Sequence, residues 1–194
     1  GIVGLGECSG WPRVIEAAVR DLAPLLVGED PTHIERLWQK MQIAMMGHGM
    51  TGVVGAGAMT GIDMALWDIK GKALGVPVHE LLGGPTRSRV RIYRNVRDPE
   101  SMKALVKQGF TAAKIGSGLA RLGQHIENPA HIRKATEYVA AMRAAAGDGF
   151  DIAVDFHGNI SPAVSKVLIK AIEPYQPAWI EDPVQCENVD VLAD

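Results

Sequence analysis

The stretch 151–172, DIAVDFHGNISPAVSKVLIKAI, carries the pattern of one strand, one loop and one helix in succession. It opens with a short apolar run that ends on Asp155, and from Pro162 its apolar residues recur at helical spacing. A second run, AWIEDP at 178–183, follows after one helix length and predicts the next strand over Ala178–Ile180. Two strands joined by a helical crossover are typical of a parallel βα unit.

The same rhythm extends toward the N-terminus. The pattern predicts strands over Val90–Tyr93, Ala112–Ile115 and Asp151–Phe156, and helices over Pro99–Gln108, Pro129–Ala146 and Pro162–Ile172. Strands that alternate with helices in this way indicate an α/β fold with a parallel sheet. Short strands in units of roughly 20–35 residues favour a barrel over an open sheet, and a closed barrel needs eight such units. We therefore expect about the first four βα units of a TIM barrel, within a longer protein.

The residues before this region show a different pattern. Helical spacing begins near Pro12, and a strong helix is predicted over Ala58–Leu74, ended by Gly75. Residues 1–7, GIVGLGE, look like the end of a strand in a sheet whose earlier strands are absent. The glycine-rich run 47–57 is either a mobile loop or the closely packed start of the next helix. The pattern therefore indicates helices after a single strand end.

The composition excludes several classes of protein. The 194 residues are 47% hydrophobic and 22% charged, with a formal net charge of -2, which is ordinary for a globular protein. No basic stripe suggests nucleic acid, and no apolar run reaches the roughly 20 residues of a membrane helix, so neither partner is expected. Two cysteines, Cys8 and Cys186, lie far apart and outside any CxxC, which predicts free thiols in a reducing cytoplasm.

Two acidic residues follow neighbouring predicted strands. Asp155 and Glu181 each stand where a strand ends, and the carboxyl ends of neighbouring parallel strands meet at one edge of the sheet. Two hard oxygen ligands at one such edge suit Mg²⁺. The alternative is that Asp155 caps the following helix and that Glu181 is an ordinary surface carboxylate.

A histidine and a lysine lie near these carboxylates in the predicted arrangement. His157 comes two residues after Asp155 and would face the same side if the strand continued. Because imidazole titrates near neutrality, it suits general acid or base chemistry. Lys114, at the end of the second barrel strand, could neutralise a substrate carboxylate or contact a metal ligand if it points inward. The alternatives are a loop histidine that caps the helix beginning near Ser161, and a solvated lysine.

Several motifs together resemble the enolase superfamily, in its mandelate racemase and muconate-lactonizing group. They cover nearly all of the chain: Val3–Glu7, Thr60–Lys72, Val76–Gly84, Asp155–Gly158 and Trp179–Val184. The resemblance implies the C-terminal part of an α+β capping domain over residues 1–86 and the first half of a modified TIM barrel over residues 87–194. It also implies a homo-oligomer when the protein is full length.

The resemblance further implies the chemistry. Members of this superfamily remove the proton next to a carboxylate, and Mg²⁺ stabilises the enediolate. Asp155 and Glu181 would then be two metal ligands, whereas the third ligand and the base would come from later strands beyond these 194 residues. The DFHG form most resembles sugar-acid dehydratases of the galactonate type. In this group of lyases His157 would be the general acid that helps the 3-hydroxyl of a small sugar acid leave.

The chain departs from the group's patterns in places. The second strand reads Lys114-Ile115-Gly116, where racemases and lactonizing enzymes carry KxK with the second lysine as the base. This counts against racemase and cycloisomerase chemistry and leaves Lys114 as electrostatic support for a substrate. Leu5 stands where Trp is usual, Asp182 where a second Glu is common, and Gly116–Asn128 matches no dehydratase pattern. The alternatives are an acid-sugar epimerase, racemase or cycloisomerase, or a chain of this length that is inert alone.

Overall fold

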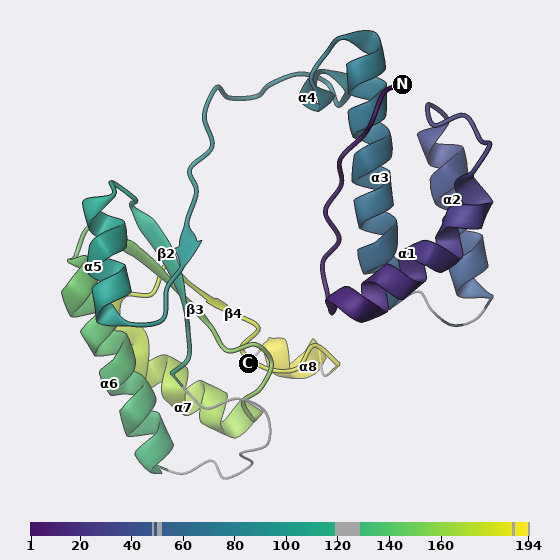
Figure 1. Cartoon of the computed structure of the whole chain (residues 1–194). Coiled ribbons are helices and arrows are strands. Elements are labelled where there is room, and N and C mark those ends of the chain that lie inside the picture. Colours follow the sequence, from purple (N-terminus) through teal and green to yellow (C-terminus); the bar gives the residue numbers. More distant parts are fainter. Residues whose placement is uncertain (48, 50–51, 119–128, 188, 194) are drawn as a thin grey trace. The chain divides into compact units, whose positions relative to one another are not determined.

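A computed structural model describes residues 1–47, 49, 52–118, 129–187 and 189–193. The chain forms two compact units, Gly1–Ser88 and Arg89–Asp194, which are taken separately below (Figure 1). Most of the segment Gly116–Asn128 lies outside the described residues. None of the helices in the described ranges is both long and apolar enough to cross a membrane.

Unit 1 is built from helices. They are α1 (Pro12–Leu26), α2 (Ile34–Met46), α3 (Val53–Leu74) and the short α4 (Val78–Leu81). The core between them contains Ile15, Ala18 and Leu22 of α1, spaced three and four residues apart as one helical face requires, together with Met41 and Met59. Because α3 starts at Val53, the second half of the glycine-rich run is the packed start of a helix. Gly75 ends α3 as predicted, with a φ of 70° that suits glycine.

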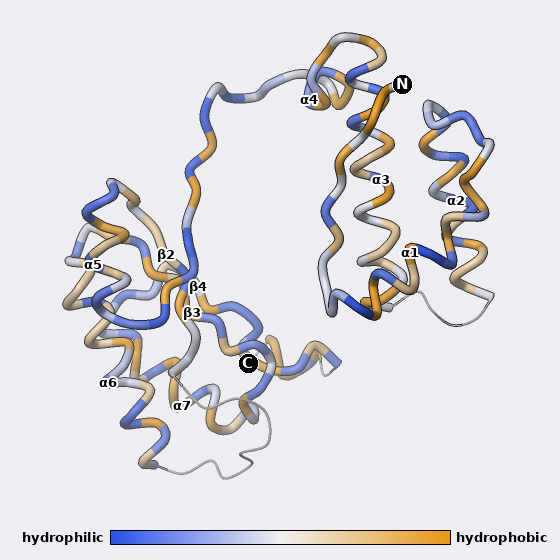
Figure 2. The backbone as a smooth tube through the Cα atoms, in the orientation of Figure 1, coloured by the Kyte–Doolittle hydropathy of each residue, from blue (hydrophilic) through white to orange (hydrophobic). Residues whose placement is uncertain are grey.

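An extended segment, residues 1–9, runs beside α3 (Figure 1). The backbone N–H of Leu5 donates to Asp68 Oδ2 at 2.7 Å, and Lys72 Nζ donates to the Val3 carbonyl at 2.8 Å. Residues 1–7 were expected to be the end of a strand whose earlier neighbours are absent, and within the described part of unit 1 they are extended and pair with no strand. Residues 1–9 contact a helix, α3. Figure 2 shows that the first half of α3 is largely apolar and that its charged residues come later.

Unit 2 contains the parallel sheet. Its strands are β1 (Arg94–Asn95), β2 (Ala112–Gly116), β3 (Asp151–Asp155) and β4 (Trp179–Glu181), in the order β1-β2-β3-β4 with every pair parallel. The helices are α5 (Pro99–Lys107), α6 (Pro129–Ala146), α7 (Pro162–Ile172), the 3₁₀ turn η1 (Glu173–Tyr175) and α8 (Val189–Leu192). This is the alternating βα order predicted for part of a TIM barrel.

Alternation along the strands separates the two faces of the sheet. Ala113 and Ile115 of β2, with Ile152 and Val154 of β3, lie in a core with apolar residues of α5, α6 and α7. Residues between them in sequence must point to the opposite face. Lys114, which lies between Ala113 and Ile115, is therefore directed to the face that these helices do not cover.

Strand boundaries differ from the predictions by a few residues. The first strand is Arg94–Asn95 instead of Val90–Tyr93, because only these two residues pair with β2, at Ala113 and Lys114. Residues 90–93 are apolar enough to suggest a strand, but they are exposed and unpaired within the described sheet. Pairing with a neighbour sets where a strand begins, and that partner is not visible in the local sequence.

Candidate metal centre and active site

Three residues of the predicted site meet at the carboxyl ends of the strands. Asp155 and Glu181 are the last residues of β3 and β4 and are directly paired. Lys114 reaches both from β2, with its Nζ 2.6 Å from Glu181 Oε1 and 3.3 Å from Asp155 Oδ2. The two carboxylates thus converge on one cation, an ammonium group. Asp155 does not cap the next helix, because the N-cap of α7 is Ser161.

The charges of this cluster reinforce one another. The Asp155 side chain is 11% exposed and that of Lys114 is 17% exposed. Burial raises the pKa of Asp155, but hydrogen bonds from His157 and Lys114 outweigh it, so that the pKa lies below the usual carboxyl value. The hydrogen bond to Glu181 raises the pKa of Lys114 above its usual value, although burial opposes this. Both groups are therefore charged throughout the neutral range.

Replacing Lys114 by Met is expected to lower the free energy of unfolding by about 2 kcal/mol at pH 7, because two adjacent, partly buried carboxylates lose their counter-charge. The lowered pKa of Asp155 means that the ion pair stabilises the fold above about pH 4, and that this contribution is lost as the pH falls through the lowered value. Urea unfolding at several pH values should show a penalty that shrinks in acid. Lys134→Met, on the exposed side of α6, is the matched control, and an equal penalty there would contradict the prediction.

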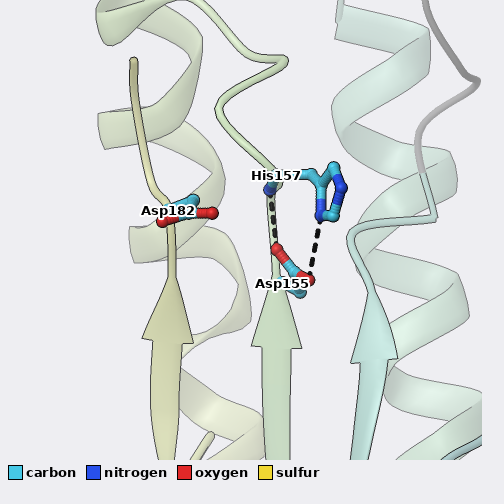
Figure 3. A group of neighbouring side chains, drawn as sticks. All are labelled: Asp155, His157 and Asp182. Atoms are coloured by element: carbon cyan, nitrogen blue, oxygen red, sulfur yellow. Dashed lines mark hydrogen bonds and ion pairs between the residues drawn. The ribbon is translucent and has the colours of Figure 1, made fainter. Parts of the chain in front are cut away.

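His157 lies just beyond β3, and its position has a different cause from the one predicted. Its φ of 58° is left-handed, so strand alternation does not apply to it. Instead Asp155 Oδ1 accepts the backbone N–H of His157 at 2.8 Å, a local turn in which an aspartate binds the backbone two residues ahead. The imidazole Nδ1 then lies 3.1 Å from Asp155 Oδ2, while the side chain is 77% exposed (Figure 3).

Asp182 is a further acidic residue at this edge, and the sequence marked it only as a replacement for a second Glu that is common in the family. One possible ligand atom each from Asp155, His157 and Asp182 lie within 4.8 Å of one another, a grouping that could hold a metal ion (Figure 3). Asp182 has a φ of 44°, and its carbonyl accepts the backbone N–H of Gly158 at 2.9 Å. Two candidate ligand sets, one with Glu181 and one with Asp182, therefore share Asp155.

A cavity of about 610 Å³ opens at the carboxyl ends of β1, β2 and β3. Its polar lining includes Lys114, Asp155 and His157, and also two amides that the sequence did not single out, Asn95 and Asn159. Glu181 is not among the lining residues. The only signal for Asn95 in the sequence was a polar residue beside a predicted strand, which is too common to be selective.

The fold and these side chains define a βα-barrel type of protein, with an acidic site at the carboxyl ends of its strands. Residues 1–83 match the family described as mandelate racemase / muconate lactonizing enzyme, N-terminal domain, and residues 98–194 match the family described as enolase C-terminal domain-like. The chain belongs to the mandelate racemase / muconate lactonizing enzyme family.

Two similar curated relatives carry the same name. The chain is 43% identical over 201 residues to a D-galactonate dehydratase of Ralstonia nicotianae, with 100% of this chain and 52% of the relative covered. A D-galactonate dehydratase of Pectobacterium atrosepticum is 41% identical over 198 residues, with 98% and 51% covered. The chain therefore spans about half the length of the curated relatives it matches.

Solved structures agree on the fold. The 3,6-anhydro-D-galactonate cycloisomerase from Zobellia galactanivorans has a TM-score of 0.86 at 31% identity, over 98% of this chain and 52% of that one. A mandelate racemase/muconate lactonizing enzyme-like protein from Rubrobacter xylanophilus has a TM-score of 0.85 at 32% identity, over 98% and 56%. The partial barrel predicted from the sequence is therefore confirmed.

Proposed function

We propose that the chain is part of a Mg²⁺-dependent lyase that dehydrates a sugar acid of the galactonate type. The observation that carries the proposal is that the carboxylates of Asp155 and Glu181 both contact the ammonium group of Lys114. The imidazole of His157 also contacts Asp155. The names of the curated relatives support the substrate class.

The donor set fits a magnesium ion. Asp155 and Glu181 offer hard carboxylate oxygens, and the fold already directs both onto a positive charge, that of Lys114. These two residues would hold the ion, and further ligands would come from outside the 194 residues. A bound Mg²⁺ would supply positive charge that stabilises the negative charge developing on the substrate carboxylate.

His157 is the proposed general acid. Its Nδ1 lies against Asp155, which leaves Nε2 as the ring nitrogen available to a substrate in the cavity. When a base removes the proton at C2, the electrons of that C–H bond move into the substrate carboxylate and give an enediolate. These electrons return to form the C2–C3 double bond as the C3–O bond breaks, and the hydroxyl leaves as water with a proton from His157. The resulting enol becomes a 2-keto-3-deoxy acid.

Other residues would bind the substrate. Lys114 lines the cavity beside Asp155, where its charge would attract the anionic acid. The amides of Asn95 and Asn159 can both donate and accept hydrogen bonds, as the hydroxyl groups of a sugar acid require. We propose that the base lies beyond the 194 residues, because the second strand carries Gly116 where a lysine base stands in racemases.

Cycloisomerisation is the second candidate, favoured by the likeness to the cycloisomerase of known structure. The two reactions differ in mass balance, since dehydration removes one water and cycloisomerisation removes none.

The test is to incubate the complete natural protein with six-carbon aldonic acids, and separately with their anhydro forms, with Mg²⁺ or with a chelator. We expect a 2-keto-3-deoxy acid, lighter by one water in mass spectrometry, that forms only with the metal. The 194-residue chain assayed beside it should give no product. A product of unchanged mass, or dehydration that persists in the chelator, would overturn the proposal.

A further inference from the structure

The two oxygens of the Glu181 carboxylate have different partners. Oε1 accepts from Lys114 Nζ at 2.6 Å, and Oε2 lies 3.3 Å from the indole Nε1 of Trp179, which donates to it. Trp179 and Glu181 are two residues apart on β4, so their side chains share one face of the sheet. The indole therefore fixes Oε2 of the carboxylate and leaves Oε1 directed toward the ammonium group of Lys114.

The indole is itself held in place. Its ring meets that of Tyr93 edge to face, with the centroids 5.5 Å apart and the planes at 69°. Tyr93 immediately precedes β1, at the other edge of the described sheet. Trp179 is 39% exposed, so it is not fixed by burial alone, and the Tyr93 contact supplies part of its restraint.

We propose that Trp179 is a positioning residue that orients Glu181 for metal binding, with Tyr93 as its support. This inference rests on the proposed function, because it takes Glu181 as a magnesium ligand. The physical reason is that a glutamate carboxylate otherwise rotates about its terminal bond. A rigid donor on one oxygen removes that freedom before the metal binds. Lys114 cannot do this alone, since its flexible ammonium is shared with Asp155.

The main variant is Trp179→Phe, which keeps an aromatic ring for Tyr93 but lacks the N–H. Partners of this kind typically contribute 10–100-fold to metal affinity, and for a bond of 3.3 Å we expect Mg²⁺ to bind about tenfold more weakly. Calorimetric titration of the complete natural protein gives the dissociation constant directly. Trp38→Phe is the matched control, because Trp38 is 41% exposed and lies on α2 of unit 1.

A second substitution separates the hydrogen bond from packing. Replacing Trp179 by 3-benzothienylalanine keeps the shape of the indole but has sulfur in place of the N–H, so it should weaken Mg²⁺ binding as Trp179→Phe does. If Trp179 had a purely structural role, Trp179→Phe would lower the melting temperature measured without metal. The benzothienyl protein would then keep the melting temperature and the Mg²⁺ affinity of the wild type.

The outcomes are distinguishable from failure of the proposed function. If the wild-type protein binds no Mg²⁺, the proposed function fails. If the wild type binds Mg²⁺ and both Trp179 substitutions bind it equally well, only the positioning role is overturned. A weaker affinity in both, with an unchanged Trp38→Phe control, supports the inference.

Discussion

Replacing His157 by Gln is expected to slow dehydration about a thousandfold, within the 10²–10⁴-fold range typical of a positioned general acid. Glutamine keeps a polar side chain at this exposed position but cannot give a proton to the departing 3-hydroxyl. The hydrogen bond to Asp155 Oδ1 should be retained, because its donor is the main-chain N–H of residue 157. The metal ligands should therefore stay in place, and calorimetry should show nearly unchanged Mg²⁺ affinity.

A deuterium experiment makes this prediction sharper. In heavy water the variant should still exchange the C2 proton of the unreacted acid, because the proposed base is a different residue. His79→Gln, at an exposed position in unit 1, should behave as wild type. Loss of C2 exchange together with dehydration would contradict the assignment, because it would place His157 in proton removal or in the fold.

Replacing Gly6 by Ala is expected to lower the free energy of unfolding by about 3 kcal/mol, at the upper end of the usual cost of overpacking. A Cβ added at Gly6 would overlap the carbonyl oxygen of Gly61 in α3, a backbone atom that cannot move without bending the helix. The overlap is relieved only if residues 1–9 move away from α3. That movement would break the hydrogen bonds from the Leu5 N–H to Asp68 and from Lys72 to the Val3 carbonyl.

Urea unfolding measures the loss of stability, and limited proteolysis shows whether the first residues have detached. Gly47→Ala is the control in the same unit, since Gly47 has an ordinary helical φ of -58° and its added Cβ would come no closer than 3.8 Å to its neighbours. That substitution should change the free energy of unfolding by less than about 0.5 kcal/mol. Equal stability of Gly6→Ala and wild type would show that the close approach of residues 1–9 to α3 is not retained in solution.

The helices could be predicted from the sequence because their signals are local. Pro129–Ala146 and Pro162–Ile172 have the predicted bounds, since proline at the first turn and apolar spacing lie within each segment. The strand predicted over residues 90–93 was misplaced. These residues carry a strand-like sequence, but a strand exists only where another backbone accepts its hydrogen bonds, and the local sequence does not show that partner.

The candidate site was predictable in part. Asp155, Glu181 and Lys114 were proposed from their places at strand ends, and the structure brings them together. Their roles as ligands and support stay predictions. Asn95 and Trp179 were missed as site residues, because their relevance depends on which strand lies beside them.

The sequence by itself determined the βα order, the helices and the identity of the acidic residues at the strand ends, because spacing and residue type act over short stretches of chain. Only the tertiary structure decided that Lys114 lies between two carboxylates, that His157 turns back onto Asp155, and that an indole from β4 meets both Glu181 and Tyr93. The contacts of Lys114 and of the indole depend on strand register, which arises from pairing between distant segments, whereas the His157 contact depends on a left-handed residue in a local turn that the apolar pattern does not show.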